Sequence, residues 1–254
     1  MSNPFGRSFA SLSSRFHYNQ PEVLVKNIGT YIDQVKAKSL LDIGAGHSTT
    51  AIPLSQKVHR YLAIEENGTR AEELRASGLD VVVGTFPLPL SEEFDMVLSS
   101  HSVPEGKLNL YNSFLSSAWE VLNPQGTLLV VTFKGSRGDT VLLREEITRL
   151  KVGPDPQLAA IMQNLASRGN VRVEMINSYL QSPEVDDIVA FIARSIFWSG
   201  DEEERHLPQL QEILTLRYKI NGCYIFPTQH LFISVVKEDE PRMDLKGPIV
   251  FSSS

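Results

Sequence analysis

Residues 40–48 read Leu40-Leu41-Asp42-Ile43-Gly44-Ala45-Gly46-His47-Ser48. The apolar start of this stretch predicts a buried strand, and the glycines let the chain turn sharply while its backbone stays open to a ligand. A helical pattern follows over residues 49–56, and a second apolar run ends in Ala63-Ile64-Glu65-Glu66. This order of strand, glycine turn, helix and second strand predicts a βαβ unit. The acid at the end of the second strand would place its carboxylate against a ribose diol.

The glycine turn departs from the fingerprint of dinucleotide-binding proteins. That fingerprint has a third glycine, whereas this sequence has His47-Ser48 in that part of the turn. A nucleoside ligand without a pyrophosphate is therefore favoured over a dinucleotide. The two glycines alone are equally consistent with a tight turn that binds nothing, so the prediction of a ligand site depends on the segments that follow.

Strands and helices continue to alternate as far as residue 133. Apolar runs predict strands at Val81–Phe86, Phe94–Ser100 and residues 121–130, and helical patterns cover residues 21–35, 69–77 and 108–122. This order predicts an α/β fold with a Rossmann-like, doubly wound, mostly parallel sheet. Ligands of such sheets bind at the carboxyl ends of the strands.

The pattern changes in the C-terminal half. Helices are predicted over residues 140–150, 156–168, 182–199 and 207–218, and strands over 171–179 and 231–236. We expect these helices to be lid insertions, although aliphatic stripes are more usual in a core. The acidic run at 201–204 is predicted to be a solvated connection. The chain is expected to be one domain, residues 1–254, with a mobile arm or cap at 1–20, a ligand-binding half at 21–133, a substrate and lid half at 134–236, and a tail at 237–254.

Composition restricts the possible partners. The chain has 254 residues, 42% of them hydrophobic, which is enough for a full α/β core. Its formal charge of -6 disfavours nucleic acid as a partner, because nucleic-acid binding needs a basic surface. Its single cysteine, Cys223, excludes an internal disulfide and a CxxC metal site. We therefore expect no metal and a reducing, cytoplasmic location. No apolar run reaches the ~20 residues of a membrane span, so no membrane partner is expected.

Taken together, the motifs resemble those of class I S-adenosylmethionine-dependent methyltransferases, in the same order and at similar spacing. The resemblance implies a seven-stranded sheet and S-adenosylmethionine as the cofactor. It also implies that Asp42 helps to fix the methionine end of the cofactor and that Glu65 accepts hydrogen bonds from both ribose hydroxyls. Many relatives carry an acid where this chain has Thr85, which leaves the contact to the adenine amino group open. The predicted cofactor-binding residues are Asp42, Gly44, Ala45, Gly46, Glu65, Glu66, Thr85, Phe86, Ser99 and Ser100.

Over most of its length the chain is similar to the histamine N-methyltransferase-like group of that family. The similarity includes the glycine turn, Ile64-Glu65, residues 133–138 after the fifth strand, and a terminal strand at 225–236. In that group a polar side chain after the fourth strand and an amide before the last strand meet the substrate amine. By position these roles fall on His101 and on Thr228 or Gln229. Other groups replace the family's amides here, which leaves the acceptor open. His17 and Tyr18 are predicted to cover the cofactor and to bind the substrate.

The predicted reaction is methyl transfer from S-adenosylmethionine to nitrogen or oxygen of a small molecule. In-line attack on the methyl group mainly requires placement of both reactants, but an amine or hydroxyl nucleophile must also lose a proton. His101 is the predicted base because it follows the fourth strand and because its ordinary pKa suits proton transfer. His230 is a second candidate. The alternative is that His101 only hydrogen-bonds the loop or the substrate.

Other functions stay open at this point. A protein of this fold can bind the cofactor without transferring methyl, as a cyclisation catalyst or a regulatory binder. A nicotinamide-dependent oxidoreductase is disfavoured by the missing third glycine. Nucleic-acid methylation is disfavoured because Ser99-Ser100-His101-Ser102 lacks the Asn/Asp-Pro-Pro-aromatic signature of enzymes that methylate exocyclic amines.

Overall fold

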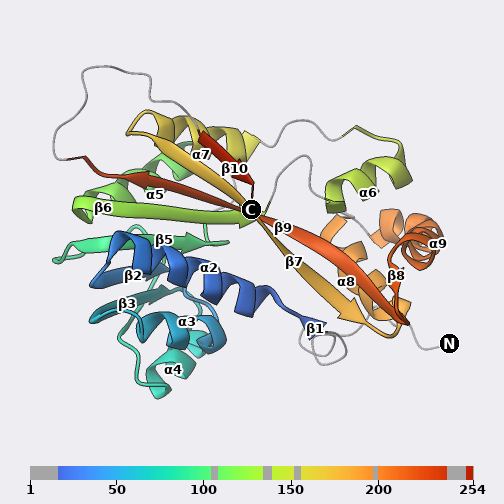
Figure 1. The fold of residues 1–254 in the computed structure, drawn as a ribbon, viewed down its shortest axis with the longest axis horizontal. Helices are drawn as coiled ribbons and strands as arrows, with labels where there is room; N and C mark the ends of the chain where they lie inside the picture. The colour runs from blue at the N-terminus through green and yellow to red at the C-terminus, as the bar shows by residue number, and fades with distance from the viewer. Residues whose placement is uncertain are drawn as a thin grey trace. The chain divides into compact units, whose positions relative to one another are not determined.

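The computed structural model describes residues 17–103, 108–133, 139–151, 156–196, 200–238 and 250–253. The chain forms two compact units (Figure 1). The sheet unit comprises Pro21–Phe133, Asp155–Ile176 and His230–Ser254, and the helical unit comprises Met1–Gln20, Lys134–Pro154 and Asn177–Gln229. Two long strands contribute residues to both units: β7 (Val171–Ser182) and β9 (Cys223–Val236).

The sheet unit is built on parallel strands. β2 (Ser39–Ile43) pairs with β3 (Arg60–Glu65) on one side and with β5 (Phe94–Ser100) on the other. β4 (Val81–Val83) pairs with β3, and β6 (Leu122–Phe133) pairs with β5, all in parallel. β9 joins β6 in the antiparallel sense. The long strands therefore follow the order β7-β9-β6-β5-β2-β3-β4, with the chain reversing direction only beyond β6.

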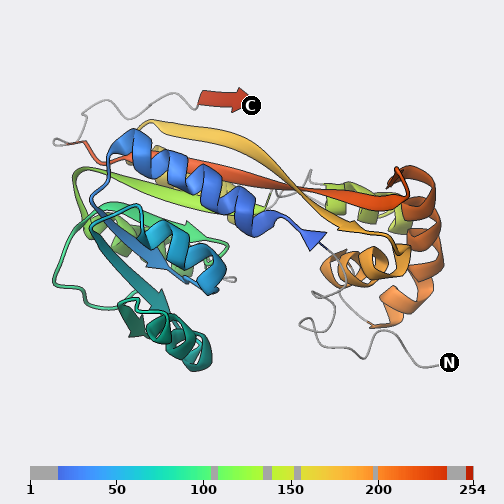
Figure 2. The same cartoon turned by 60° about the horizontal axis from the view of Figure 1, so that its bottom comes forward.

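Helices cover both faces of this sheet. α2 (Gln20–Val35), α3 (Ser48–Ser55) and α4 (Gly68–Ala76) bury their apolar residues in one cluster, on the face that Figure 2 turns toward the reader. α5 (Leu108–Glu120) and α7 (Pro156–Ala166) pack on the other face. Neighbouring residues of β2 point to opposite faces, Leu40 into the first cluster and Leu41 into the second, as expected for a strand buried on both sides.

The helical unit has a core of its own. It contains α6 (Asp139–Thr148), α8 (Val185–Ile196) and α9 (Gly200–Arg217), which bury leucine and isoleucine side chains against the neighbouring parts of β7 and β9. Two short strands complete it: β1 (His17–Tyr18) pairs with β7, and β8 (Lys219–Ile220) pairs with β9. In the sheet unit, β10 (Val250–Ser253) pairs in parallel with β7.

The predicted fold class is confirmed. The described residues form ten strands; apart from the short β1, β8 and β10, these are the seven strands of the predicted doubly wound sheet. The prediction for the acidic run was wrong, because α9 begins at Gly200 and includes residues 201–204. Carboxylates are favoured in the first turns of a helix by the partial positive charge of its N-terminus. The lid role of α6, α8 and α9 stays a prediction.

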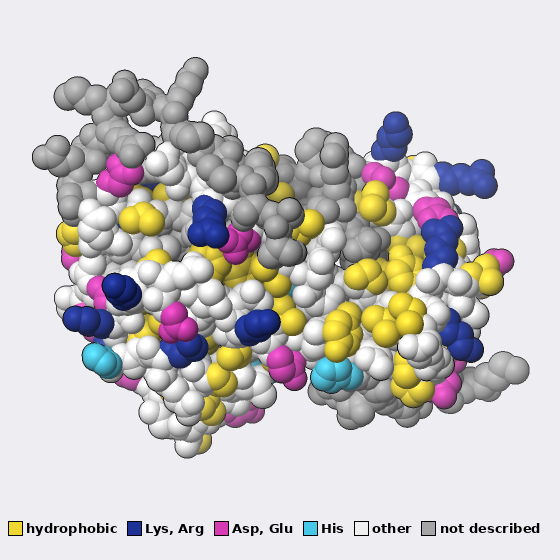
Figure 3. Space-filling model, viewed as in Figure 1, with side chains coloured by type: hydrophobic (Ala, Val, Ile, Leu, Met, Phe, Trp, Pro, Cys, Tyr) yellow, Lys and Arg dark blue, Asp and Glu magenta, His cyan; other side chains and the backbone are white. Residues whose placement is uncertain are grey.

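The surface carries charges of both signs. In the view of Figure 3, Lys and Arg side chains alternate with Asp and Glu over the described residues. Among the helices that the structure describes, none has the length and apolarity needed to cross a membrane.

Candidate functional site

The glycine turn lies at the carboxyl end of β2. Gly44 and Gly46 both have positive φ, 72° and 67°, a conformation that other residues adopt only with strain. The amides of Gly44 and Ala45 donate to the carbonyl of Ile64 in the adjacent strand, at 2.8 and 3.2 Å. Among the described residues, a Cβ added at Gly46 would meet only the Gly44 carbonyl, at 3.7 Å. The outer side of the turn is therefore open at Gly46.

Glu65 ends β3 next to this turn. Its carboxylate accepts the backbone N–H of Gly46 at 2.8 Å with one oxygen and that of Asn67 at 2.9 Å with the other. The side chain is 4% exposed. Glu65, which the sequence predicts to bind a ribose, thus also connects the glycine turn to the end of β3. Its carboxylate lies beside the half-buried backbone of Gly46.

Asp42 lies inside β2 and is buried. The Tyr61 hydroxyl, from β3, donates to its carboxylate at 2.7 Å. Burial raises the pKa of Asp42 to about 6, although the Tyr61 hydrogen bond opposes that rise; the charge of Glu65 adds to it. Sequence analysis did not identify Tyr61; its distinguishing signal is a polar atom in the apolar run between Arg60 and Glu65.

The segment after β5 packs against the glycine turn. Ser102 donates to the carbonyl of Ile43 at 2.5 Å and its oxygen lies 2.9 Å from that of Ser99. A Cβ on Gly44 would lie 2.4 Å from the Cβ of Ser102. Ser99 is therefore buried and contacts Ser102, which packs against the glycine turn. Ser100 is half-buried. Ser102 follows the predicted site in sequence but was not assigned a role.

The predicted adenine-contacting turn lies beyond β4. The Thr85 hydroxyl donates to the Glu66 carboxylate at 3.2 Å, and both residues are exposed. The Phe86 ring is buried and packs edge-to-face against Phe114 of α5, with ring centroids 5.3 Å apart. Side-chain contacts to a ligand could thus come from Thr85 and Glu66, whereas Phe86 offers only its backbone.

Two predicted histidines are brought together in the sheet unit. His101 directly follows β5, and Nδ1 of His230 lies 3.2 Å from Nε2 of His101. Phe133, which pairs with His230 across β6 and β9, places its ring centroid 4.2 Å from that of His101. His101 has positive φ, 55°, and its backbone N–H donates to the Val131 carbonyl at 2.8 Å.

Burial keeps both imidazoles neutral at physiological pH. It lowers the pKa of His101 to about 3, with a further contribution from His230, and it lowers the pKa of His230 to about 4. A ring with so low a pKa is a weak base. It can take a proton from an acceptor only while methylation is making that acceptor strongly acidic.

The other predicted acceptor residues belong to the helical unit. The Thr228 hydroxyl lies 2.5 Å from that of Ser178, and both are buried. The Tyr18 hydroxyl also hydrogen-bonds to these two residues, while burial raises its pKa to about 12. Gln229 is half-buried, and His17 is exposed with its ring 6.1 Å from that of Tyr179. The structure thus joins Tyr18 to Thr228 and adds Ser178, which sequence analysis missed.

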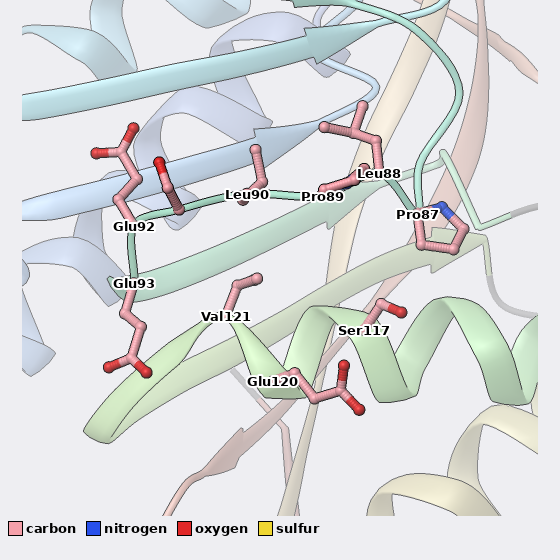
Figure 4. Close-up of a pocket in the computed structure, with 10 residues that line it drawn as sticks. Pro87, Leu88, Pro89, Leu90, Glu92, Glu93, Ser117, Glu120 and Val121 are labelled. Atoms are coloured by element: carbon pink, nitrogen blue, oxygen red, sulfur yellow. The ribbon is translucent and has the colours of Figure 1, made fainter.

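A separate cavity of about 550 Å³ lies in the sheet unit (Figure 4). Its wall is the extended segment from Pro87 to Glu93, facing the end of α5 and the start of β6 at Ser117, Glu120 and Val121. Glu93 and Val121 precede the amino ends of β5 and β6, whereas the glycine turn and Glu65 lie at carboxyl ends. No predicted site residue lines this cavity. Among the described residues, no group of three or more His, Cys, Asp or Glu is placed to hold a metal ion.

Comparisons with known proteins bear on the fold. No protein-family model matches the sequence, and no curated protein matches it either. The YcgJ protein of Bacillus subtilis is 17% identical, with a TM-score of 0.56 over 86% of this chain and 99% of that one. A candidate methyltransferase from Bacillus halodurans C-125 is 15% identical, with a TM-score of 0.54 over 84% of this chain and 99% of that one. A functionally unknown protein from Deinococcus radiodurans R1 is 12% identical, with a TM-score of 0.53 over 88% of this chain and 90% of that one.

At these identities the likeness establishes the fold, a mostly parallel Rossmann-like sheet of the kind found in a candidate methyltransferase. The finer resemblance to the histamine N-methyltransferase-like group stays a prediction.

Proposed function

We propose that this protein binds S-adenosylmethionine at the glycine turn and transfers its methyl group to nitrogen or oxygen of a small molecule. One observation carries the proposal. The positive-φ glycines Gly44 and Gly46 end one parallel strand, and the Gly46 N–H is bonded to the Glu65 carboxylate that ends the next. A carboxylate beside a half-buried glycine backbone, at the carboxyl edge of a doubly wound sheet, suits a nucleoside with a ribose diol.

The residues present fit such a ligand. An ionised carboxylate has about four lone-pair sites, and the two backbone N–H groups of Gly46 and Asn67 use two of those on Glu65. The remaining capacity matches two ribose hydroxyls. The open side of the turn at Gly46 supplies room for a ligand to approach the backbone. We assign the methionine end to Asp42 and the turn at Gly44–Gly46, and the adenine to Thr85, Glu66 and the backbone of Phe86, with Ser99 and Ser100 at the end of β5.

The proposed chemistry needs placement more than reactive groups. When bound, S-adenosylmethionine supplies a methyl group on a positively charged sulfur. The protein's part is to hold the acceptor in line with that methyl, and such placement can supply roughly 7–11 kcal/mol of the barrier. His101, at the end of β5, is the proposed group that receives the acceptor's proton, since its neutral ring keeps a lone pair at physiological pH.

The residues that bind the methyl acceptor are proposed from their positions in the sequence and from their local contacts. Thr228 and Gln229 directly precede His230 on β9. Thr228 shares its hydrogen-bonded cluster with Tyr18 and Ser178, and three hydroxyls in contact offer both donors and acceptors to a polar small molecule. His17 precedes Tyr18 on β1 and is proposed with it as part of the covering segment.

Calorimetric titration with S-adenosylhomocysteine tests the cofactor assignment. The wild-type protein should bind it, and Glu65→Gln should weaken binding by about 1.5–3 kcal/mol, the scale of lost hydrogen bonds to a charged group. Glu93→Gln is the matched control, because that carboxylate lines the cavity at the amino ends of the strands and should leave the affinity unchanged. Absence of binding, or equal affinity in both variants, would contradict the proposal.

Transfer itself is tested with methyl-labelled S-adenosylmethionine and a panel of small amines and alcohols. The proposal expects label in the acceptor and one S-adenosylhomocysteine formed per methyl transferred. Binding of the cofactor without this product across the panel would point instead to a cyclisation catalyst or a regulatory binder. Preferential binding of a nicotinamide dinucleotide in a parallel titration would favour an oxidoreductase.

A further inference from the structure

The two histidines at the end of β5 and in β9 occupy different surroundings. His230 is fully buried, with 0% of its surface exposed, whereas His101 is only partly buried. Of the two rings, only that of His101 can therefore touch an acceptor. His230 can influence a reaction through the Nδ1–Nε2 contact of 3.2 Å with His101.

This contact limits the hydrogens on the two rings to two arrangements. A neutral imidazole has one N–H donor and one lone-pair nitrogen, so one ring must donate across the contact and the other must accept. If Nε2 of His101 donates, its Nδ1 keeps a lone pair and can accept a proton. If Nδ1 of His230 donates instead, Nδ1 of His101 carries a hydrogen and cannot act as a base.

We propose that His230 is a positioning residue for His101: its Nδ1 accepts the Nε2–H of His101 and so holds Nδ1 of His101 as the free lone pair facing the acceptor. This rests on the proposed methyl transfer. As the bond from nitrogen or oxygen to the methyl carbon forms and the carbon–sulfur bond breaks, the acceptor's hydrogen moves as a proton to Nδ1 of His101. The resulting imidazolium keeps its Nε2–H bonded to His230 and later releases the proton to solvent.

The surrounding backbone holds His101 in place for this role. Its N–H donates to the Val131 carbonyl and its φ is positive, which fixes the backbone from which the ring projects. The Phe133 ring, 4.2 Å from His101 and 5.2 Å from His230 by centroid, packs against both. Phe133 does not titrate, and among the described residues His230 is the group that adds to the lowering of the His101 pKa by burial.

The arrangement also restricts the acceptor. A lone pair on Nδ1 is useful only if the attacking atom carries a hydrogen, as a hydroxyl or a primary or secondary amine does. Methylation of a tertiary amine releases no proton, so its rate should not depend on His230. Paired acceptors with and without a hydrogen on the attacking atom therefore separate the proton-accepting role from simple packing.

Nitrogen-15 NMR of the histidine-labelled protein tests the proposal without any acceptor. Ring-nitrogen shifts identify the protonated nitrogen, and the expected result is a single His101 tautomer with hydrogen on Nε2. A coupling across the hydrogen bond to Nδ1 of His230 should be visible in the wild-type protein. A hydrogen on Nδ1 of His101, or an even mixture of tautomers, would overturn the proposal.

Two variants and a control sharpen this test. His230→Leu removes the hydrogen-bond acceptor and should leave His101 as a mixture of tautomers, whereas His230→Gln offers an amide oxygen and should restore the Nε2–H form. Phe133→Leu removes the ring contact but not the hydrogen bond, so the wild-type tautomer should persist. An unchanged His101 spectrum in His230→Leu would overturn the proposal, and should that variant not fold, the wild-type coupling decides. Failure of the methyltransferase proposal would appear separately, as absent binding of S-adenosylhomocysteine.

Discussion

Gly44 and Ser102 approach each other so closely that a single methyl group on Gly44 would lie 2.4 Å from the Cβ of Ser102. Ser102 reaches this position by donating to the Ile43 carbonyl, so the segment after β5 is fastened across the end of β2. The glycine at position 44 is required twice, once by its positive φ of 72° and once by this contact. Within the described part of the chain, Gly46 is required only by its φ of 67°, because its added Cβ would meet no described atom closer than 3.7 Å.

The first prediction compares alanine at these two glycines. Gly46→Ala should lower the free energy of unfolding by roughly 1–2 kcal/mol, the cost of a left-handed conformation in a residue with a Cβ. Gly44→Ala should cost clearly more, because the clash with Ser102 adds to the same backbone strain. Urea unfolding measures both differences.

A double variant identifies why Gly44→Ala should lower the free energy of unfolding more than Gly46→Ala. Ser102→Gly removes the atom that would clash, so in this background the two alanine variants should be destabilised equally. A Gly44→Ala penalty that stays larger after Ser102→Gly would show that the close approach is not what position 44 must avoid.

The second prediction concerns the buried pair of Tyr61 and Asp42. Tyr61→Phe removes the donor at 2.7 Å and leaves a buried carboxylate oxygen without it, which should lower the free energy of unfolding by about 1–3 kcal/mol. It should also raise the pKa of Asp42 above about 6, because the Tyr61 bond opposes the effect of burial. Carbon-13 NMR of the carboxyl group follows the pKa. In an Asp42→Asn background the cost of Tyr61→Phe should be smaller; an equal cost would assign the effect to packing.

The third prediction concerns the dependence of stability on pH. Burial lowers the folded-state pKa of His101 to about 3 and of His230 to about 4, from 6.5, so the unfolded chain binds two more protons than the fold as pH falls below 6.5. Asp42 acts in the opposite direction, because its folded pKa of about 6 lies above its ordinary 3.8. The net difference is one proton between about pH 6 and 4, and stability should fall there by about 1.4 kcal/mol per pH unit as the pH decreases.

Two variants separate the contribution of Asp42 to this pH dependence from that of the histidines. Asp42→Asn removes the opposing contribution and should make the fall with decreasing pH steeper, whereas His230→Gln should make it shallower. Urea midpoints at pH 7, 6 and 5 measure these slopes. The same slope in all three proteins would show that other groups determine the acid sensitivity.

Much of the fold could be predicted because its signals are local. The glycine turn, the acid at Glu65 and the apolar runs of the parallel strands each lie within a few residues of sequence, and their order predicts the doubly wound sheet. The start of α9 was missed because the acidic residues at 201–204 are compatible with both a helix N-terminus and a solvated loop.

The side-chain contacts of the site could not be predicted in the same way. Tyr61 meets Asp42 from a neighbouring strand, and Ser102 meets Gly44 across 58 positions of chain, so both contacts depend on register rather than on local pattern. His101 and His230 were identified separately by position, yet their hydrogen bond depends on the pairing of β6 with β9. A single sequence contains no direct signal for such pairs.

The last prediction concerns turnover, once an acceptor is found. If His101 receives the acceptor's proton, His101→Gln should lower kcat by the ~10²–10⁴-fold typical of losing general acid–base catalysis, while the affinity for S-adenosylhomocysteine stays unchanged. Because the pKa of His101 lies near 3, the wild-type rate should show no loss of this base between pH 7 and 5. Steady-state kinetics over that range, with His59→Gln as a matched control, measure both effects. Full turnover in His101→Gln would eliminate the proton-accepting role; a raised KM with unchanged kcat would leave His101 as a group that orients the acceptor.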